Sequence, residues 1–143
     1  MRIDRIIQDK GGDVVTIAPG ATVADAAALL AEKRIGAVIV CEEGAAPAGI
    51  LSERDIVRQL GTSGASCLEQ TVSELMTTNL KSCARTDTLD TVLTQMTQGR
   101  FRHVPVMEDG QMVALVSIGD VVKSRLSELA LERDALEGMV RGH

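Results

Sequence analysis

The apolar and polar positions of the chain follow one another in the same order in its two halves. With a shift of 66 residues, which becomes 65 after one deletion in a polar loop, equivalent residues fall on one another. The matched pairs are Thr22 and Thr88, Val23 and Leu89, Leu30 and Met96, Val38 and Val104, Val40 and Val106, Ser52 and Ser117, and Asp55 and Asp120. Self-similarity at a fixed period indicates that one supersecondary unit is present twice.

Each copy contains a predicted helix with one buried face. Apolar residues recur there at i, i+3, i+4 and i+7, which is the spacing along one side of a helix. They are Val23, Ala26, Ala27 and Leu30 in the first copy and Leu89, Val92, Leu93 and Met96 in the second. Thr22 and Thr88 stand at the N-cap positions, so we expect the helices to begin directly after them.

Short runs of apolar and β-branched residues predict three strands in each copy. The strands are residues 14–17, 37–41 and 48–51 in the first copy and 80–83, 104–107 and 112–116 in the second. In each copy the last two strands form a hairpin around an acidic-Gly turn, at 42–44 and 108–110. A second helix follows each hairpin, at 53–60 and from residue 119 onward.

The repeating unit is therefore β-α-β-β-α, which predicts a mixed α/β (α+β) fold class. A unit of about 60 residues cannot bury its sheet and helices alone, so we expect the copies to pack through a pseudo-two-fold axis. We place the first repeat at residues 8–64, the second at 72–126 and a C-terminal helical extension at 127–143. The Gly-Ser composition of 61–66 predicts a flexible linker, followed by a short helical turn at 72–76.

The last helix is predicted to continue to about residue 140, well beyond its counterpart in the first copy. It carries a stripe of apolar residues interrupted by Arg133. The stripe consists of Val122, Leu126, Leu129, Leu136 and Val140. Two interpretations stay open: the helix packs back on its own core, or it forms a homodimer contact. The second is favoured, because the first copy has no equivalent helix to pack against.

Composition excludes several classes of protein. The chain of 143 residues has no Trp, no Tyr and one Phe, and its net charge is −5, so a nucleic-acid partner is not expected. No apolar run approaches the ~18 residues of a membrane span, and the first residues lack a secretory apolar region, which predicts a cytoplasmic protein without a membrane partner. Cys41, Cys67 and Cys83 are widely spaced and are interpreted as reduced thiols in the core, with redox or metal chemistry as the weaker alternative.

The candidate chemistry lies in a repeated Ser-x-x-Asp element between a strand and a helix. It occurs as Ser52 with Asp55 and as Ser117 with Asp120. A helix N-terminus offers unpaired N–H groups to a phosphate, and a carboxylate in the first turn can accept the hydroxyls of a ribose. The alternative is a plain capping box, in which the same residues only satisfy the helix end.

Basic residues beside the second copy's hairpin could neutralise a phosphate. Arg100, Arg102 and His103 directly precede the apolar strand, whereas Ile35, Gly36 and Ala37 of the first copy, which correspond to residues 101–103, are uncharged. Lys10, followed by two glycines, is a further possible phosphate contact. The alternatives are a solvated strand entry for the first segment and a mobile entry loop for Lys10. We find no nucleophile, base or metal-ligand spacing and therefore expect neither an enzyme nor a metal site.

The motifs resemble those of tandem cystathionine β-synthase (CBS) domain pairs, also called Bateman modules. They are Ala-Gly-Ile-Leu-Ser-Glu-Arg-Asp-Ile-Val at 48–57, Arg-His-Val-Pro-Val at 102–106 and Val-Ser-Ile-Gly-Asp-Val-Val at 116–122. The resemblance extends over residues 14–125, with no other domain attached, as in the small stand-alone CBS proteins. It implies a regulatory module that binds AMP, or ADP, ATP, NAD(H) or S-adenosylmethionine, in two clefts between the copies. It also implies a disc-like homodimer and a regulated partner protein.

The resemblance assigns roles to residues that, together with Lys10, make twelve candidate ligand contacts. Asp120 and Asp55 would hold ribose hydroxyls, Ser117 and Ser52 would reach ribose or phosphate, and Arg102 with His103 would neutralise phosphate. Adenine would lie against the strands near Thr16, Ile17, Ala37 and Val104. The first copy lacks the Arg-His pair, which puts occupancy of its cleft in doubt unless Arg54 compensates. The competing hypothesis is a scaffold that dimerises without a ligand.

Overall fold

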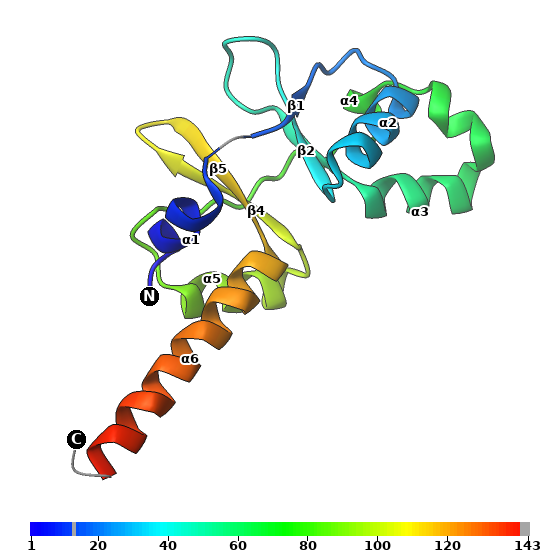
Figure 1. Cartoon of the computed structure of the whole chain (residues 1–143). Coiled ribbons are helices and arrows are strands. Elements are labelled where there is room, and N and C mark those ends of the chain that lie inside the picture. Colours follow the sequence, from blue (N-terminus) through cyan, green and yellow to red (C-terminus); the bar gives the residue numbers. More distant parts are fainter. Residues whose placement is uncertain (13, 141–143) are drawn as a thin grey trace. The chain divides into compact units, whose positions relative to one another are not determined.

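The computed structural model describes residues 1–12 and 14–140 and has the predicted mixed α/β architecture, including the extended C-terminal helix (Figure 1). In chain order the elements are α1 (Ile3–Lys10), β1 (Thr16–Ile17), α2 (Val23–Lys33), β2 (Ala37–Val40), β3 (Gly49–Ser52), α3 (Glu53–Ser63), the 3-10 helix η1 (Gly64–Glu69), α4 (Val72–Leu75), α5 (Leu89–Gly99), β4 (His103–Glu108), β5 (Gln111–Ser117) and α6 (Ile118–Val140). None of the described helices is both long enough and apolar enough to cross a membrane.

The described chain forms two compact units, each with its own core. Unit 1 contains residues 1–12, 82–109 and 113–140, and unit 2 contains residues 14–81 and 110–112. The first twelve residues therefore belong to the same unit as the second copy of the repeat. We describe each unit by itself.

Unit 2 is built on the three-stranded sheet β1-β2-β3. β1 pairs in parallel with β2, and β2 pairs antiparallel with β3 in a register that sets Ala37 opposite Ser52. All four residues of β2 are buried, which explains its continuous apolar sequence. Helices α2, α3 and α4 complete the core. Its buried members are Val23, Ala26, Leu30, Val38, Val40, Leu51, Ile56 and Val72.

Unit 1 is built on the hairpin β4-β5 and helices α1, α5 and α6. The hairpin turn has positive φ at Asp109 (52°) and Gly110 (76°), the conformation that a two-residue type I′ turn requires. Asp and Gly tolerate it, so the acidic-Gly turn predicted from the sequence is confirmed. The core consists of Ile3, Ile6, Ile7, Cys83, Leu89, Val92, Met96, Val104, Val106, Ala114, Val116 and Val121.

Both predicted repeat helices have the expected caps. The hydroxyl of Thr22 accepts a hydrogen bond from the N–H of Asp25, and the Asp25 carboxylate accepts one from the N–H of Thr22. Thr88 accepts from the N–H of Thr91 in the same way. Both helices also end alike, because Arg34 and Arg100 each adopt the left-handed conformation, with φ of 55° and 56°. The repeat is thus visible in backbone detail.

Three segments differ from the sequence prediction. Residues 61–66 are not a flexible linker: α3 continues to Ser63 and η1 follows, with the hydroxyl of Ser66 donating to the carbonyl of Ser63. Residues 80–83 form no strand and contribute a single parallel bridge between Cys83 and Val106. Helix α1 was not predicted at all, although its isoleucines lie at i, i+3 and i+4 and are buried in unit 1.

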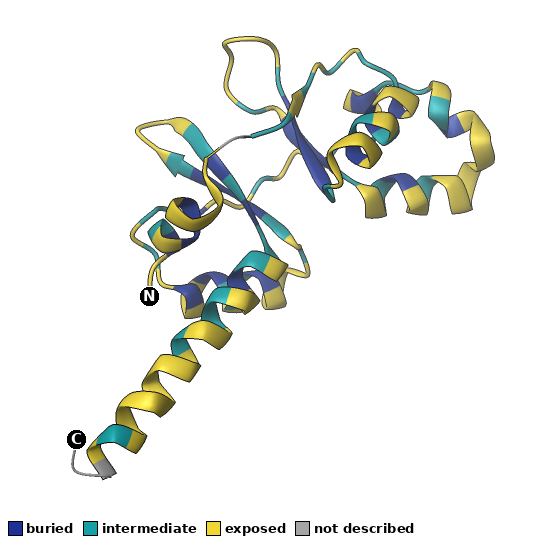
Figure 2. Ribbon diagram, viewed as in Figure 1, coloured by how far each residue is buried: buried dark blue, intermediate teal, exposed yellow. Residues whose placement is uncertain are grey.

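The burial pattern of α6 changes along its length (Figure 2). Near its start Val121 is fully buried, and Arg125 forms an ion pair with Asp90 at 2.9 Å. Beyond Glu128 almost every residue is exposed. The distal half of α6 therefore does not pack back on the described core, in contrast to one of the two interpretations of the sequence.

Candidate functional site

The first Ser-x-x-Asp element forms the N-terminus of α3 in unit 2. The N–H of Ser52 donates to Oδ2 of Asp55 at 2.9 Å, and the N–H of Asp55 donates to Oγ of Ser52 at 3.2 Å. The Ser52 hydroxyl also donates to Asp55 Oδ2, at 3.0 Å. Arg58 approaches the other carboxylate oxygen only to 3.9 Å. The capping box is complete, and the ion pair of its acid with Arg58 is long.

The second element repeats this geometry at the N-terminus of α6 in unit 1. The N–H of Ser117 donates to Oδ2 of Asp120 at 3.0 Å, and the N–H of Asp120 donates to Oγ of Ser117 at 3.1 Å. Here a cation is added: Nζ of Lys10 lies 2.7 Å from Asp120 Oδ2 and 3.3 Å from the carbonyl of Leu115. Lys10 is the last residue of α1, so that helix delivers the ammonium to the site.

The electrostatic state of Asp120 follows from these contacts. Partial burial acts to raise the pKa of Asp120, but the hydrogen bonds from Lys10 and Ser117 outweigh it and hold this pKa below its ordinary value. Asp120 is therefore a carboxylate at neutral pH. An ionised carboxylate can accept the hydroxyl hydrogens of a diol such as ribose.

The start of each Ser-x-x-Asp helix is tied to the residue that precedes a strand. The N–H of Glu53 donates to the carbonyl of Gly36 at 2.9 Å, and the equivalent N–H of Ile118 donates to the carbonyl of Arg102 at 2.8 Å. These contacts bring Gly36 beside the α3 N-terminus and Arg102 beside the α6 N-terminus. The predicted basic segment and the predicted ribose-binding acid therefore meet in unit 1.

The twelve residues singled out from the sequence divide equally between the units. Unit 1 holds Lys10, Arg102, His103, Val104, Ser117 and Asp120, and unit 2 holds Thr16, Ile17, Ala37, Ser52, Arg54 and Asp55. The side chains of Arg102, Arg54 and Thr16 are exposed, whereas Val104 and Ala37 are buried in their own unit. We call each set a candidate half-site; the one in unit 1, with Lys10, Arg102 and His103, is the more cationic.

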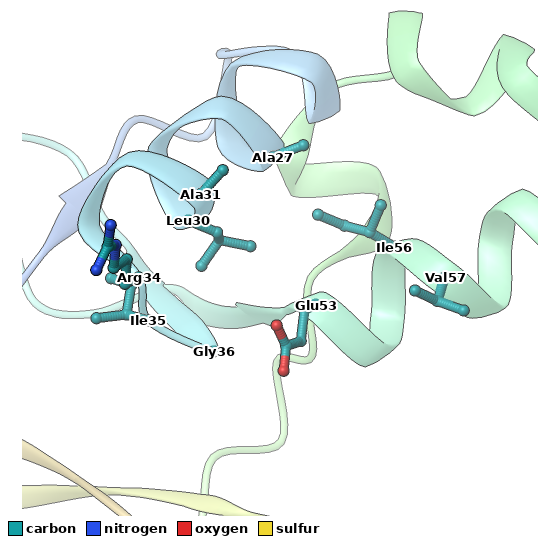
Figure 3. A pocket seen from close by; sticks show the side chains of 9 residues that line it. All are labelled: Ala27, Leu30, Ala31, Arg34, Ile35, Gly36, Glu53, Ile56 and Val57. Atoms are coloured by element: carbon teal, nitrogen blue, oxygen red, sulfur yellow. The ribbon is translucent and has the colours of Figure 1, made fainter.

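A cavity of about 470 Å³ lies between α2 and α3 of unit 2 (Figure 3). It is lined by Ala27, Leu30, Ala31, Arg34, Ile35, Gly36, Glu53, Ile56 and Val57. In the figure Leu30 and Ile56 face one another across an apolar floor, and the carboxylate of Glu53 lies at one edge. None of the twelve predicted residues lines it. The helical spacing predicted the buried face of α2, but it could not predict that a cavity remains between α2 and α3.

Thiol and metal chemistry receive no support from the described residues. Within residues 1–12 and 14–140, no group of three or more His, Cys, Asp or Glu side chains could hold a metal ion. The three cysteines are free; Cys67 and Cys83 are buried and Cys41 is partly exposed. Burial, with a smaller contribution from the charge of Asp87, raises the pKa of Cys83 to about 12. That thiol is therefore inert at neutral pH.

Comparison with known proteins gives consistent results. The family model for the CBS domain matches residues 7–62 and 72–127. The mitochondrial CBS domain-containing protein CBSX3 of Arabidopsis thaliana is 34% identical over 125 residues, which cover 85% of this chain and 61% of the plant protein. The chain thus spans less than two thirds of that relative's length.

Solved structures extend the likeness to the fold. The crystal structure of the CBS-domain containing protein ATU1752 from Agrobacterium tumefaciens is 43% identical, with a TM-score of 0.84 over 87% of this chain and 92% of that one. The CBS domain pair of protein MJ0100, solved with 5′-methylthioadenosine and S-adenosyl-L-methionine, has a TM-score of 0.78 over 90% of this chain and 98% of that one. Its sequence identity is 21%, so this likeness concerns the fold.

Proposed function

The chain belongs to the CBS domain family, and from this premise we propose that it is a regulatory module that binds an adenine nucleotide at its two half-sites. AMP, ADP, ATP, NAD(H) and S-adenosylmethionine are the candidate ligands, because all of them carry an adenosine. In this proposal a bound ligand favours one conformation of the chain, a regulated partner protein distinguishes the conformations, and no reaction is catalysed.

One observation carries the proposal: the two Ser-x-x-Asp elements place an acid in the first turn of a helix in the same geometry. At α6 the acid is ionised and three basic or titratable residues accompany it, namely Lys10, Arg102 and His103. This combination suits a ligand with a diol at one end and an anion at the other. The adenosyl ligands of the MJ0100 domain pair support the choice of an adenosine.

In the unit 1 half-site, ligand binding would exchange the Lys10–Asp120 ion pair for contacts with the ligand. The ammonium of Lys10 contacts Oδ2 of Asp120, an oxygen that could also accept a ribose hydroxyl. When ribose binds Asp120, the long Lys10 side chain would turn to the phosphate, so the salt bridge is replaced by two contacts with the ligand. Arg54 is the one basic residue among those predicted for the unit 2 half-site, and we propose that this half-site binds the same ligand more weakly.

The rival function is a scaffold that dimerises without a ligand. The complete capping boxes favour it, because Ser52 with Asp55 and Ser117 with Asp120 are already satisfied by one another. Capping alone does not require a lysine 110 residues away to contact Asp120. The two functions are separated by a binding measurement.

The test is calorimetric titration of the nucleotide-free chain with each candidate ligand, together with thermal unfolding. The chain lacks Trp and Tyr, so any nucleotide that co-purifies is visible as absorbance at 260 nm and can be removed first. A ligand at 100 times its Kd should stabilise the fold by about 2.7 kcal/mol. We expect Asp120→Ala to abolish most of this stabilisation and Asp55→Ala to remove a smaller part.

Asp25→Ala is the matched control. Asp25 occupies the same position in the capping box of α2 but belongs to neither half-site. It should lower stability like the other two changes while leaving the ligand-induced shift intact. If no candidate nucleotide binds, or if all three variants respond to the ligand like the wild type, the scaffold function is correct.

A further inference from the structure

The ammonium of Lys10 takes in unit 1 the hydrogen-bonding place that the hydroxyl of Ser52 takes in unit 2. Oδ2 of Asp55 accepts hydrogen bonds from the N–H and the hydroxyl of Ser52. Oδ2 of Asp120 accepts from the N–H of Ser117 at 3.0 Å and from Nζ of Lys10 at 2.7 Å. One acid is thus satisfied by a neutral group of its own motif, and the other by a cation that α1 supplies.

A ligand diol competes with Lys10 for Asp120. Two ribose hydroxyls can donate to the two oxygens of a carboxylate, and one oxygen of Asp120 already accepts from Lys10. A ribose that uses this oxygen displaces the ammonium. If the ligand carries a phosphate, the ammonium can move to it on its flexible four-carbon stem and form a new charged contact. If the ligand is uncharged, the ammonium returns to water and the lost ion pair is not replaced.

We propose that the exchange of this ion pair makes the unit 1 half-site selective for phosphorylated adenosine ligands, such as AMP, over uncharged ones, such as adenosine and 5′-methylthioadenosine. The inference rests on the proposed function and goes beyond it, because it states which ligands the half-site rejects and through which contact. Lys10 acts in two ways. It attracts a phosphate, and it competes with the ribose of any ligand that has no anion to offer.

Arg102 could attract the same phosphate but cannot compete with the ribose. Its side chain is exposed, and its carbonyl accepts a hydrogen bond from the N–H of Ile118 at the start of α6. Among residues 1–12 and 14–140 the Arg102 guanidinium forms no ion pair, whereas Lys10 pairs with Asp120. An uncharged ligand therefore displaces nothing from Arg102. Removal of Arg102 should weaken AMP binding alone, and removal of Lys10 should also strengthen adenosine binding.

The experiment is calorimetric titration of the full chain with AMP and with adenosine, which differ by one phosphate. All chains carry Asp55→Ala, so that the unit 1 half-site keeps the unaltered Ser-x-x-Asp element. We expect Lys10→Met to weaken AMP binding about fivefold, because a charge-assisted contact is lost. It should tighten adenosine binding about twofold, because the solvent-screened ion pair no longer competes. The preference for AMP over adenosine should therefore fall by about tenfold.

Three variants serve as controls for Lys10→Met. Lys10→Arg keeps a cation at this position and should keep most of the preference for AMP. Lys33→Met removes the same charge from the last residue of α2, outside this half-site, and should change neither affinity. Arg102→Met should weaken AMP binding and leave adenosine binding unchanged. Lys10, Lys33 and Arg102 are all exposed, so circular dichroism should report unaltered folding.

The direction of the change in adenosine affinity decides the inference. If Lys10→Met does not tighten adenosine binding, the ion pair does not compete with ribose and the selectivity proposal is overturned. The proposed function then still stands, provided that AMP binds. If neither AMP nor adenosine binds the folded Asp55→Ala chain, the proposed function fails and the selectivity fails with it.

Discussion

Replacing Asp120 by Asn should destabilise the chain more than replacing Asp55 by Asn. The two acids occupy equivalent capping boxes, and an Asn oxygen can still accept the hydrogen bond from the Ser117 or Ser52 N–H. Both variants lose the favourable effect of a negative charge at a helix N-terminus, about 0.3–1 kcal/mol. Only Asp120→Asn also loses the ion pair with Lys10.

The exposure of the two side chains sets a range for the free energy that the Lys10–Asp120 ion pair contributes to stability. The side chains of Lys10 and Asp120 are 41% and 27% exposed, so solvent screens the pair and about 0.2–1 kcal/mol is the appropriate range. We therefore expect Asp55→Asn to cost about 0.5 kcal/mol and Asp120→Asn about 1–1.5 kcal/mol. A double-mutant cycle with Lys10→Met should give a coupling free energy of about 0.5 kcal/mol.

The assay is urea unfolding followed by circular dichroism at 222 nm, because the chain has no Trp to report fluorescence. Equal slopes of free energy against urea among the variants are required before the values are compared. The reasoning is refuted if Asp55→Asn costs as much as Asp120→Asn, or if the cycle gives no coupling between Lys10 and Asp120.

The same pair predicts a pH dependence of known sign. The pKa of Asp120 is lower in the folded chain than in the unfolded chain, so its contribution to stability is fully present above about pH 4. It is lost as the pH falls through the folded pKa, because Asp120 must then be protonated in both states. The stability difference between the wild type and Asp120→Asn should therefore disappear below that pH, and a difference that grows on acidification would contradict the assignment.

Two further experiments, a thiol modification and a glycine substitution, test the packing inside the individual units. In the native chain the Cys83 thiol, with its pKa of about 12, should remain unmodified by Ellman's reagent at pH 8, while the partly exposed Cys41 reacts. Both thiols should react in urea. Rapid modification of Cys83 in the native chain would contradict its burial. Gly49→Ala should lower the unfolding free energy by about 1–3 kcal/mol, because a Cβ there would lie 2.7 Å from Sδ of Met76. The control Gly20→Ala, which meets nothing within 4 Å, should be close to neutral in the same urea titration.

Features that depend on neighbours in sequence could be predicted from the sequence alone. The N-cap at Thr22 and the turn at Asp109 and Gly110 are set by residues within four positions of one another, so local chemistry determines them. The repeat itself was recognisable because equivalent core positions, such as Leu30 and Met96, keep their spacing although the residues differ. These signals were sufficient to predict the α/β class.

Features that depend on residues far apart in sequence could not be predicted in this way. Lys10 and Asp120 are 110 residues apart, and no sequence periodicity predicts that α1 places Lys10 beside Asp120. The glycines and serines of residues 61–66 suggested a linker, yet Gly64 (φ 73°) ends α3 and leads into η1, whose Cys67 is buried. In both cases tertiary packing, rather than local preference, determines the structure.

The place of α1 in unit 1 has a consequence for the order of events during synthesis. Ile3, Ile6 and Ile7 are buried against residues that begin at Cys83, so more than 70 residues separate them from their partners. At about 5–20 residues per second, the ribosome needs roughly 4 to 15 seconds to reach the first of those partners. The three isoleucines stay uncovered throughout that interval, and by its end unit 2 has nearly all of its own residues. Folding on the ribosome should therefore start with unit 2, and a chaperone that holds apolar segments would find an early target in the isoleucines of α1.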